Sequence, residues 1–184
     1  MSTKTRVADV MTKTVVTVAP DARLDEAARL LRVHHISGVP VVDPPHHAIG
    51  MLSEHDIVRK LHRATGVASA RGLLDLLLGS APARGQNILE VSRRQLRNTR
   101  VDDAMTSPVV TVDRDAPLEE AARRMRVHSV KRLPVVDEHD TLVGIVSRAD
   151  IVQAVSGATR RRRGALQPAP RARAGNASGP FEDA

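Results

Sequence analysis

Two short motifs place an aspartate three residues after a serine: Ser53 with Asp56, and Ser147 with Asp150. Each motif follows a β-branched apolar run and precedes an amphipathic stretch, so we expect each to open a helix. The free N–H groups of a helix start, together with a serine hydroxyl, can hold a phosphate. A carboxylate at the aspartate position can accept hydrogen bonds from both hydroxyls of a ribose. The motifs therefore indicate a nucleotide or nucleoside site.

The same spacing has a structural interpretation. In a capping box, the serine side chain accepts from the backbone N–H three residues on, and the acidic side chain accepts from the serine N–H. The two interpretations are compatible, because a ligand can displace a cap. From these residues alone, both stay open.

Charges near the two motifs differ. In the second copy, Lys131 and Arg132 precede the expected strand at 133–136 and Arg148 follows Ser147, and a cleft that contained these three would suit a phosphorylated ligand. The first motif contains Glu54, which disfavours phosphate and suits a nucleoside or no ligand at all. The alternative is that these are solvated surface charges.

Several kinds of chemistry are excluded or not expected. The chain has no Cys, Trp or Tyr and a single Phe, Phe181, so thiolate chemistry and aromatic stacking of bases are absent. The adjacent pairs His34-His35 and His46-His47 cannot both face one ligand from a helix, so we expect no metal site. No nucleophile–base pair or P-loop lysine is present, so we expect no catalytic residues and no enzyme activity.

The chain contains an internal repeat. Val7-Ala8-Asp9-Val10-Met11-Thr12 aligns with Val101-Asp102-Asp103-Ala104-Met105-Thr106, an offset of 94 residues, and this offset holds without a gap in the first 37 residues of each copy. It holds again for 49–61 against 143–155. Two copies of one unit therefore make up most of the 184 residues.

Each copy predicts the order β-α-β-β-α, which makes the fold class α/β. The strands are expected at 15–18, 39–42 and 49–52, and at 109–112, 133–136 and 142–146. The spacing of Leu24, Ala27, Ala28 and Leu31 predicts a first helix, and the second helix follows each serine motif. One sheet face of so small a unit lacks a cover. We therefore expect the repeats to pack sheet to sheet with pseudo-twofold symmetry.

The motifs DVMT…VVTV…PVVD…G-x-x-S-x-x-D, present in both copies, resemble a tandem pair of CBS domains, also called a Bateman module. The resemblance implies a stand-alone regulatory sensor that binds AMP, ADP, ATP, S-adenosylmethionine or NAD between the domains and signals to an unidentified regulated protein. It also implies a homodimer and a ribose role for Asp56 and Asp150. With no aromatic ring available, we expect adenine near Thr14, Val15, Pro108 and Val109.

The organisation expected from the sequence is a first CBS domain at 7–62, a linker with helical segments at 63–100, a second CBS domain at 101–156 and a disordered Arg/Pro/Ala-rich tail at 157–184. The linker contains an apolar cluster that could contact a dimer partner, formed by Leu73, Leu74, Leu76, Leu77 and Leu78. The simpler interpretation is that this cluster packs on its own module.

Of the net charge of +7, the segment 158–184 carries +4, because it holds six arginines against Glu182 and Asp183: Arg160, Arg161, Arg162, Arg163, Arg171 and Arg173. A nucleic-acid-associated regulator that uses this tail is the alternative function, although nucleic-acid binding is not our main expectation. No apolar run is long enough to span a membrane and no secretory signal begins the chain, so we expect a cytoplasmic protein.

Overall fold

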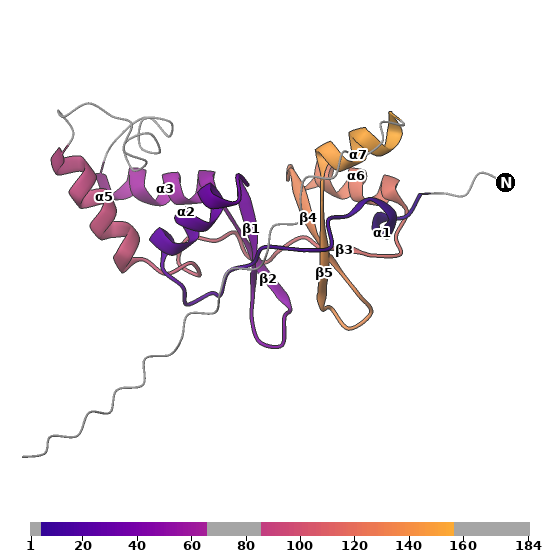
Figure 1. The fold of residues 1–184 in the computed structure, drawn as a ribbon, viewed down its shortest axis with the longest axis horizontal. Coiled ribbons are helices and arrows are strands. Elements are labelled where there is room, and N and C mark those ends of the chain that lie inside the picture. The colour runs from indigo at the N-terminus through magenta and orange to yellow at the C-terminus, as the bar shows by residue number, and fades with distance from the viewer. Residues whose placement is uncertain (1–4, 66–85, 157–184) are drawn as a thin grey trace, which may run out of the picture.

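The computed structural model describes residues 5–65 and 86–156, which form two similar units side by side (Figure 1). The first unit contains helices α2 (Leu24–Val33), α3 (Glu54–Thr65) and α5 (Gln86–Asn98) and strands β1 (Gly38–Val42) and β2 (Ala48–Ser53). The second unit contains the short helix α1 (Val7–Val10), helices α6 (Leu118–Val127) and α7 (Arg148–Val155), and strands β3 (Val112–Asp113), β4 (Arg132–Val136) and β5 (Leu142–Ser147). The leucine cluster at 73–78 and the basic tail lie outside the described residues.

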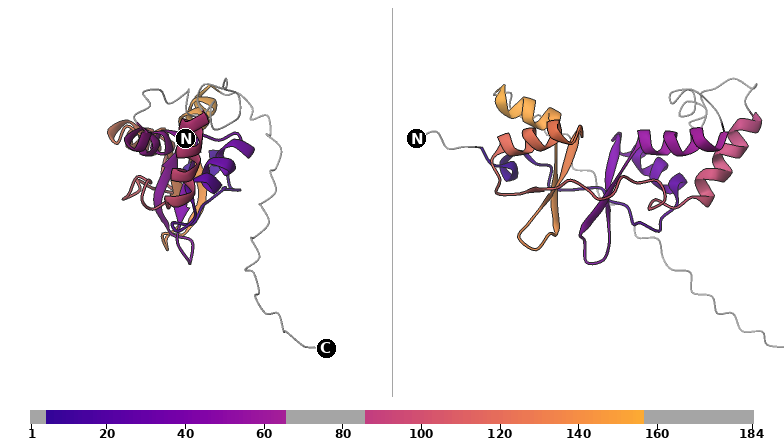
Figure 2. Two further views of the ribbon diagram at one scale, coloured as in Figure 1. Left: turned by 90° about the vertical axis from the view of Figure 1, so that its left-hand side faces the viewer. Right: turned by 180° about the vertical axis from the view of Figure 1, so that it is seen from behind.

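The two hairpins have the same register. Gly38 pairs with Ser53 in the antiparallel β1–β2 hairpin, and Arg132 pairs with Ser147 in the antiparallel β4–β5 hairpin. β3 adds to β4 in parallel. The helices of each unit lie on the outer side of its sheet, and the two sheets meet at the centre of the molecule (Figure 2). The predicted α/β pair of repeats is therefore confirmed.

The predicted strand at 15–18 is wrong in its extent. Only Val18 pairs with β1, through Val41, and in the second copy only Val112 and Asp113 form a strand. These β-branched runs form few backbone pairings with neighbouring strands because they carry the chain from one unit to the other. Thr12 pairs with Ile145 in the second unit, and six residues later Val18 pairs in the first.

The segment before each repeat packs on the other unit. Val7 and Met11 belong to the core of the second unit, whereas Val101 and Ala104 belong to the core of the first. The two junctions use the same hydrogen bonds: Val7 N donates to Ala116 O at 3.0 Å, and Val101 N donates to Ala22 O at 2.9 Å. The folded units are therefore offset from the sequence repeats, and each unit contains residues from both copies.

Two glycines make this exchange possible. Met11 lies over Gly144 of β5, and Met105 lies over Gly50 of β2, so close that a Cβ at either glycine would collide with the methionine sulfur. Each methionine leads directly into the threonine that pairs with the neighbouring strand, Thr12 with Ile145 and Thr106 with Met51. The crossing segment is thus seated by both packing and backbone hydrogen bonds.

The helices pack as their sequence spacing predicts. α2 buries Leu24, Ala27 and Leu31, and α6 buries the equivalent Leu118, Ala121 and Met125. Within the described residues, no helix is long and apolar enough to cross a membrane.

Candidate functional site

Both serine motifs lie where a strand ends and a helix begins, and both form a capping box. Ser147 N donates to Asp150 Oδ2 at 2.9 Å, and Ser147 Oγ donates to the same oxygen at 2.6 Å. Ser53 makes the corresponding bonds to Asp56 Oδ2 at 3.0 and 2.5 Å. The capping interpretation therefore describes this structure, and a ribose would have to compete with these contacts.

The other carboxylate oxygen of Asp56 is also engaged. Arg59 Nη2 donates to Asp56 Oδ1 at 2.9 Å, and Thr106 Oγ1 lies 3.4 Å from it. Thr106 arrives from the crossing segment, so Asp56 ties the α3 helix start to the chain that leaves this unit. The position equivalent to Arg59 in the second repeat is Gln153, which brings no charge to Asp150. The two aspartates therefore stand in different electrostatic surroundings.

Arg132 joins the two units. Its Nη1 donates to Gly38 O at 2.8 Å and its Nη2 donates to Ser37 Oγ at 2.5 Å. We call the region around Ser37, Gly38 and Arg132 the seam. Gly38 is the repeat equivalent of Arg132, and a Cβ at Gly38 would lie 3.3 Å from Arg132 Nη1. The missing side chain in one copy thus makes room for the long side chain of the other.

Electrostatics at the seam follow from this packing. Burial lowers the pKa of the Arg132 guanidinium below its usual value, and the nearby Glu54 carboxylate opposes that shift. The sequence led us to expect Glu54 in the first, less basic site and Arg132 in the second. In the structure, the Glu54 carboxylate is close enough to Arg132 to act on its charge. Both charges influence any ligand in this region.

The remaining basic candidates are more exposed. Arg148 lies at the start of α7, where its Nε donates to Val130 O at 3.2 Å and its backbone N donates to Lys131 O at 3.0 Å. The Lys131 side chain is exposed. Because Arg132 is the ladder partner of Ser147, all three basic residues lie around the second helix start.

The residues expected near adenine lie on the crossing segments. Thr14 and Pro108 are exposed, while Val15 and Val109 are half-buried. Val109 lines a cavity of about 560 Å³ that also contacts Thr111, Val136, Asp140 and the first-unit residues His47 and Ala48. The other three do not line this cavity.

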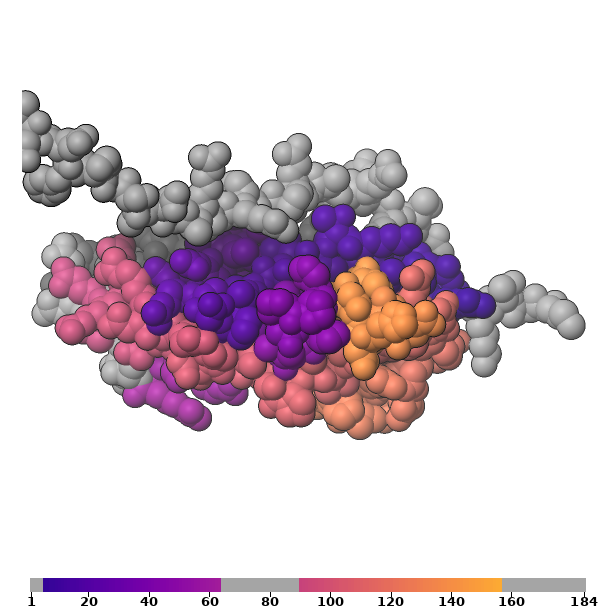
Figure 3. Space-filling model, turned by 90° about the horizontal axis from the view of Figure 1, so that it is seen from below, coloured from indigo at the N-terminus to yellow at the C-terminus, as the bar shows by residue number. Residues whose placement is uncertain are grey.

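The two hairpin tips meet beside this cavity, and Figure 3 shows them next to each other on the lower face. Leu142 N donates to His46 O at 3.0 Å, and His47 pairs with Thr141. Among the described residues, no group of three or more His, Asp or Glu side chains is arranged to hold a metal ion.

Two residues that contact the candidate site, Thr106 and Ser37, were not predicted from the sequence. The repeat contained a signal for the first, since Thr12 and Thr106 occupy equivalent places in the two copies. The contact between Ser37 and Arg132 had no comparable signal, because it depends on how the units meet.

Comparison with known proteins identifies the class. The model of the CBS domain family matches residues 7–63 and 101–157, and this chain belongs to the CBS domain family as a tandem pair. An uncharacterized protein of Methanocaldococcus jannaschii, MJ1426, is 35% identical over 152 residues, which cover 80% of this chain and 89% of the relative. The CBS domain-containing protein YhcV of Bacillus subtilis is 30% identical and covers 79% and 81% of the two chains.

Solved structures agree. The CBS domain of a CBS domain-containing membrane protein from Sphaerobacter thermophilus superposes with a TM-score of 0.66 at 30% identity, covering 82% of this chain and 87% of that one. CBSX2 in complex with AMP gives a TM-score of 0.60 at 27% identity, with coverages of 84% and 98%. The CBS domain pair of MJ0100, in complex with 5-methylthioadenosine and S-adenosyl-L-methionine, gives 0.59 at 25% identity, with coverages of 82% and 99%.

Some matching proteins are enzymes, but the match covers a small part of them. It spans 22% of an inosine-5'-monophosphate dehydrogenase of Methanocaldococcus jannaschii and 24% of a homoserine O-acetyltransferase of Methanococcoides burtonii. CBS-pair proteins are generally regulatory, and the shared segment here is the CBS pair.

Proposed function

We propose that this protein is a regulatory sensor that binds an adenine-containing ligand at the seam and transmits occupancy to a partner protein, without catalysis. The observation that carries the proposal is the position of Arg132, a partly buried cation between the two helix starts. A ligand phosphate is the natural partner for such a guanidinium. The structures of CBSX2 with AMP and of MJ0100 with two adenosyl ligands support an adenosyl group.

Different residues would bind the phosphate, the ribose and the adenine of the ligand. Ser147 and the first N–H groups of α7 would bind phosphate together with Arg132, Arg148 and Lys131. Asp150 would bind the ribose hydroxyls, and the crossing segments at Thr14, Val15, Pro108 and Val109 would enclose adenine. Ser53 and Asp56 would form the second, less basic site.

Signal transmission follows from what Arg132 touches. In this structure its guanidinium binds Ser37 and Gly38 of the opposite unit. A phosphate that binds the same guanidinium competes with that contact. The ligand therefore binds with one affinity when Arg132 is bonded to Ser37 and Gly38, and with another when these bonds are broken. Such differential affinity is what a ligand-driven switch requires.

The test is a thermal-shift panel of AMP, ADP, ATP, S-adenosylmethionine and NAD on the full chain, followed by calorimetry. We expect at least one ligand to raise the melting temperature of the wild type. Asp150→Asn should weaken its binding by about tenfold or more, since it removes a charge-assisted acceptor. Glu119→Gln on α6, an exposed acid away from the seam, is the matched control. Unchanged binding by Asp150→Asn would count against the site.

We also propose that the protein is a homodimer formed through the α6–α7 face. Val127, Val152 and Val155 are exposed there by 57%, 65% and 81%. The equivalents of the last two in the first unit, Val58 and Leu61, are buried on α3, a helix that α5 contacts. A second copy presenting the same apolar face would bury these valines in the same way. Val152→Asp should shift the mass measured by light scattering from dimer to monomer, and an unchanged mass would exclude this interface.

The alternative, a nucleic-acid-associated regulator, depends on the basic tail, which lies outside the described residues. Removing 159–184 and measuring DNA retention at moderate salt separates the two functions. Retention that persists without the tail would exclude the tail as the binding element.

A further inference from the structure

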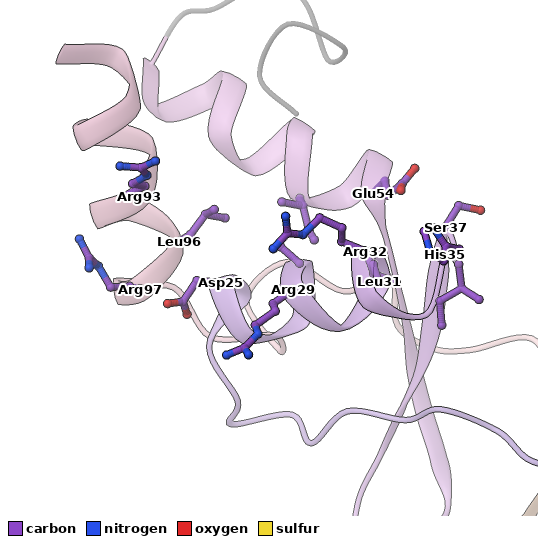
Figure 4. Close-up of a pocket in the computed structure, with 13 residues that line it drawn as sticks. Asp25, Arg29, Leu31, Arg32, His35, Ser37, Glu54, Arg93, Leu96 and Arg97 are labelled. Carbon is purple, nitrogen blue, oxygen red and sulfur yellow. The ribbon is translucent and has the colours of Figure 1, made fainter. Parts of the chain in front are cut away.

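A separate groove lies on the helical side of the first unit, between α2, α3 and α5 (Figure 4). Its volume is about 610 Å³, within the size range of small-molecule pockets. Ala28 and Ile36, both half-buried, contribute apolar surface to the groove, and the buried Leu31, Ile57 and Leu96 from the three helices lie beneath it. The groove is open to solvent and has an apolar floor, and none of the residues proposed to bind the adenosyl ligand lines it.

The rim of the groove is cationic. Arg29 and Arg32 extend from α2, and Arg93 and Arg97 extend from α5 (Figure 4). None of these four guanidinium groups forms a hydrogen bond or ion pair with another residue in the described part of the chain. The acids on the rim are Asp25 and Glu54. Positive charge thus exceeds negative charge around an apolar interior.

The second repeat shows how arginines on this helix are otherwise satisfied. Arg123, the equivalent of Arg29, donates to Glu120 at 2.7 Å on its own helix, and Arg124 donates to the same carboxylate at 2.8 Å. In the first repeat, Glu26 stands at the position of Glu120 but forms no such pair with Arg29. Arg29 is therefore left available to a ligand, whereas its equivalent Arg123 is neutralised on its own helix.

The groove also depends on a helix that only one unit possesses. α5 supplies one wall and two of the four arginines, whereas in the second unit α7 is contacted by the four-residue helix α1 and by α6. The feature therefore does not arise from the repeated unit itself, and its chemistry is particular to the first half of the molecule.

We infer that this groove is a second binding site, for a small organic anion with an apolar body. Its carboxylate, sulfonate or phosphate head would bind the rim arginines, and its hydrocarbon body would lie on Ala28 and Ile36, above the buried Leu31, Ile57 and Leu96. Guanidinium groups form bidentate contacts with such head groups, and burying the hydrocarbon body against the apolar floor of the groove is favourable. Ser37 and Glu54 line one end of the groove. Since Ser37 also accepts from Arg132, an occupant there touches the same residue that holds the seam.

The experiment uses 8-anilinonaphthalene-1-sulfonate as the probe on the full chain. The protein has no Trp or Tyr, so the probe fluorescence is read without background from those residues. We expect saturable binding at one site. Octyl phosphate and octanoate should displace the probe, whereas sulfate and octyl glucoside, each carrying only half of the required chemistry, should displace it at least tenfold less well. Equal displacement by sulfate or by octyl glucoside would overturn the inference.

Matched variants locate the site. Arg93→Gln with Arg97→Gln should weaken probe binding by about tenfold or more, because two charge-assisted contacts are lost. Arg94→Gln with Arg126→Gln removes the same charge from exposed positions that do not line the groove and should leave binding within about twofold. Arg29→Gln with Arg32→Gln tests the α2 side independently. Equal affinity in all three double variants would overturn the site, and it would do so without affecting the nucleotide experiment at the seam.

Discussion

At the scale of single residues, the two copies can pack against each other because they differ at one equivalent position. Gly38 and Arg132 occupy the same place in the repeat, yet one provides space and the other fills it. The sequence identified Arg132 as a candidate cation, and it identified Ser147 and Asp150 as a motif with two compatible roles. It could not predict that Arg132 reaches Ser37, because that contact depends on the placement of one unit against the other, which no local pattern encodes.

Arg132→Gln tests the contribution of the seam to stability. The variant loses two hydrogen bonds that connect the units, so we expect the free energy of unfolding to fall by about 1–3 kcal/mol. Urea denaturation followed by circular dichroism measures the change. Arg126→Gln, an exposed arginine on α6, is the control and should shift stability by less than about 0.5 kcal/mol. Equal effects would show that the contact across the seam adds nothing to stability.

The pH dependence of Glu120 gives a second test at this scale. Hydrogen bonds from Arg123 and Arg124 lower the pKa of Glu120 to about 2 from 4.5. A depressed folded-state pKa contributes stability that is complete above the unfolded value and is lost as the pH falls toward the folded value. Glu120→Gln should therefore reduce the urea midpoint at pH 7, and its difference from the wild type should shrink between pH 4.5 and 2.

Glu119→Gln is the neighbouring control for this measurement, since Glu119 is exposed and forms no ion pair within the described residues. Its difference from the wild type should not follow the same pH window. A Glu120 effect that is constant from pH 7 to pH 2 would contradict the assigned pKa.

At the scale of elements, the helices were the most predictable part. The apolar spacing of α2 and α6 corresponds to helices in the structure, and α5 is one of the helical segments expected in the linker at 63–100. The strand at 15–18 was wrong because a β-branched run suits a crossing segment as well as a ladder. The exchange at Val7 and Val101 had no signal at all, since a buried valine fits either core equally well.

Leu61 and Val155 occupy the same repeat position and provide a matched pair for packing. Leu61 is fully buried in the core that α5 helps to form, whereas Val155 is 81% exposed on α7. Leu61→Ala should lower the free energy of unfolding by about 2–5 kcal/mol, as cavity-forming substitutions do. Val155→Ala, measured at a protein concentration that keeps the chain monomeric, should change it by less than about 0.5 kcal/mol. Comparable losses would mean that α7 is covered within a single chain.

At the scale of the whole molecule, the exchanged segments make the two halves one folding unit. A cut between Arg100 and Val101 separates the sequence repeats but divides both cores. The N-terminal fragment keeps Val7 and Met11 without the core they enter, and it loses Val101 and Ala104. Burying a valine or methionine side chain is worth about 1.5–3 kcal/mol, so each fragment loses a large share of a small domain's stability.

We therefore expect fragments 1–100 and 101–184 to be unfolded separately and to fold when mixed. Heteronuclear NMR spectra of one labelled fragment should change from poorly dispersed to dispersed on addition of one equivalent of the other. The intact chain should unfold in a single transition in urea, because neither core is complete without both copies. Dispersed spectra from either fragment alone, or two separate transitions in the intact chain, would show that the exchange is peripheral and that the repeats are independent domains.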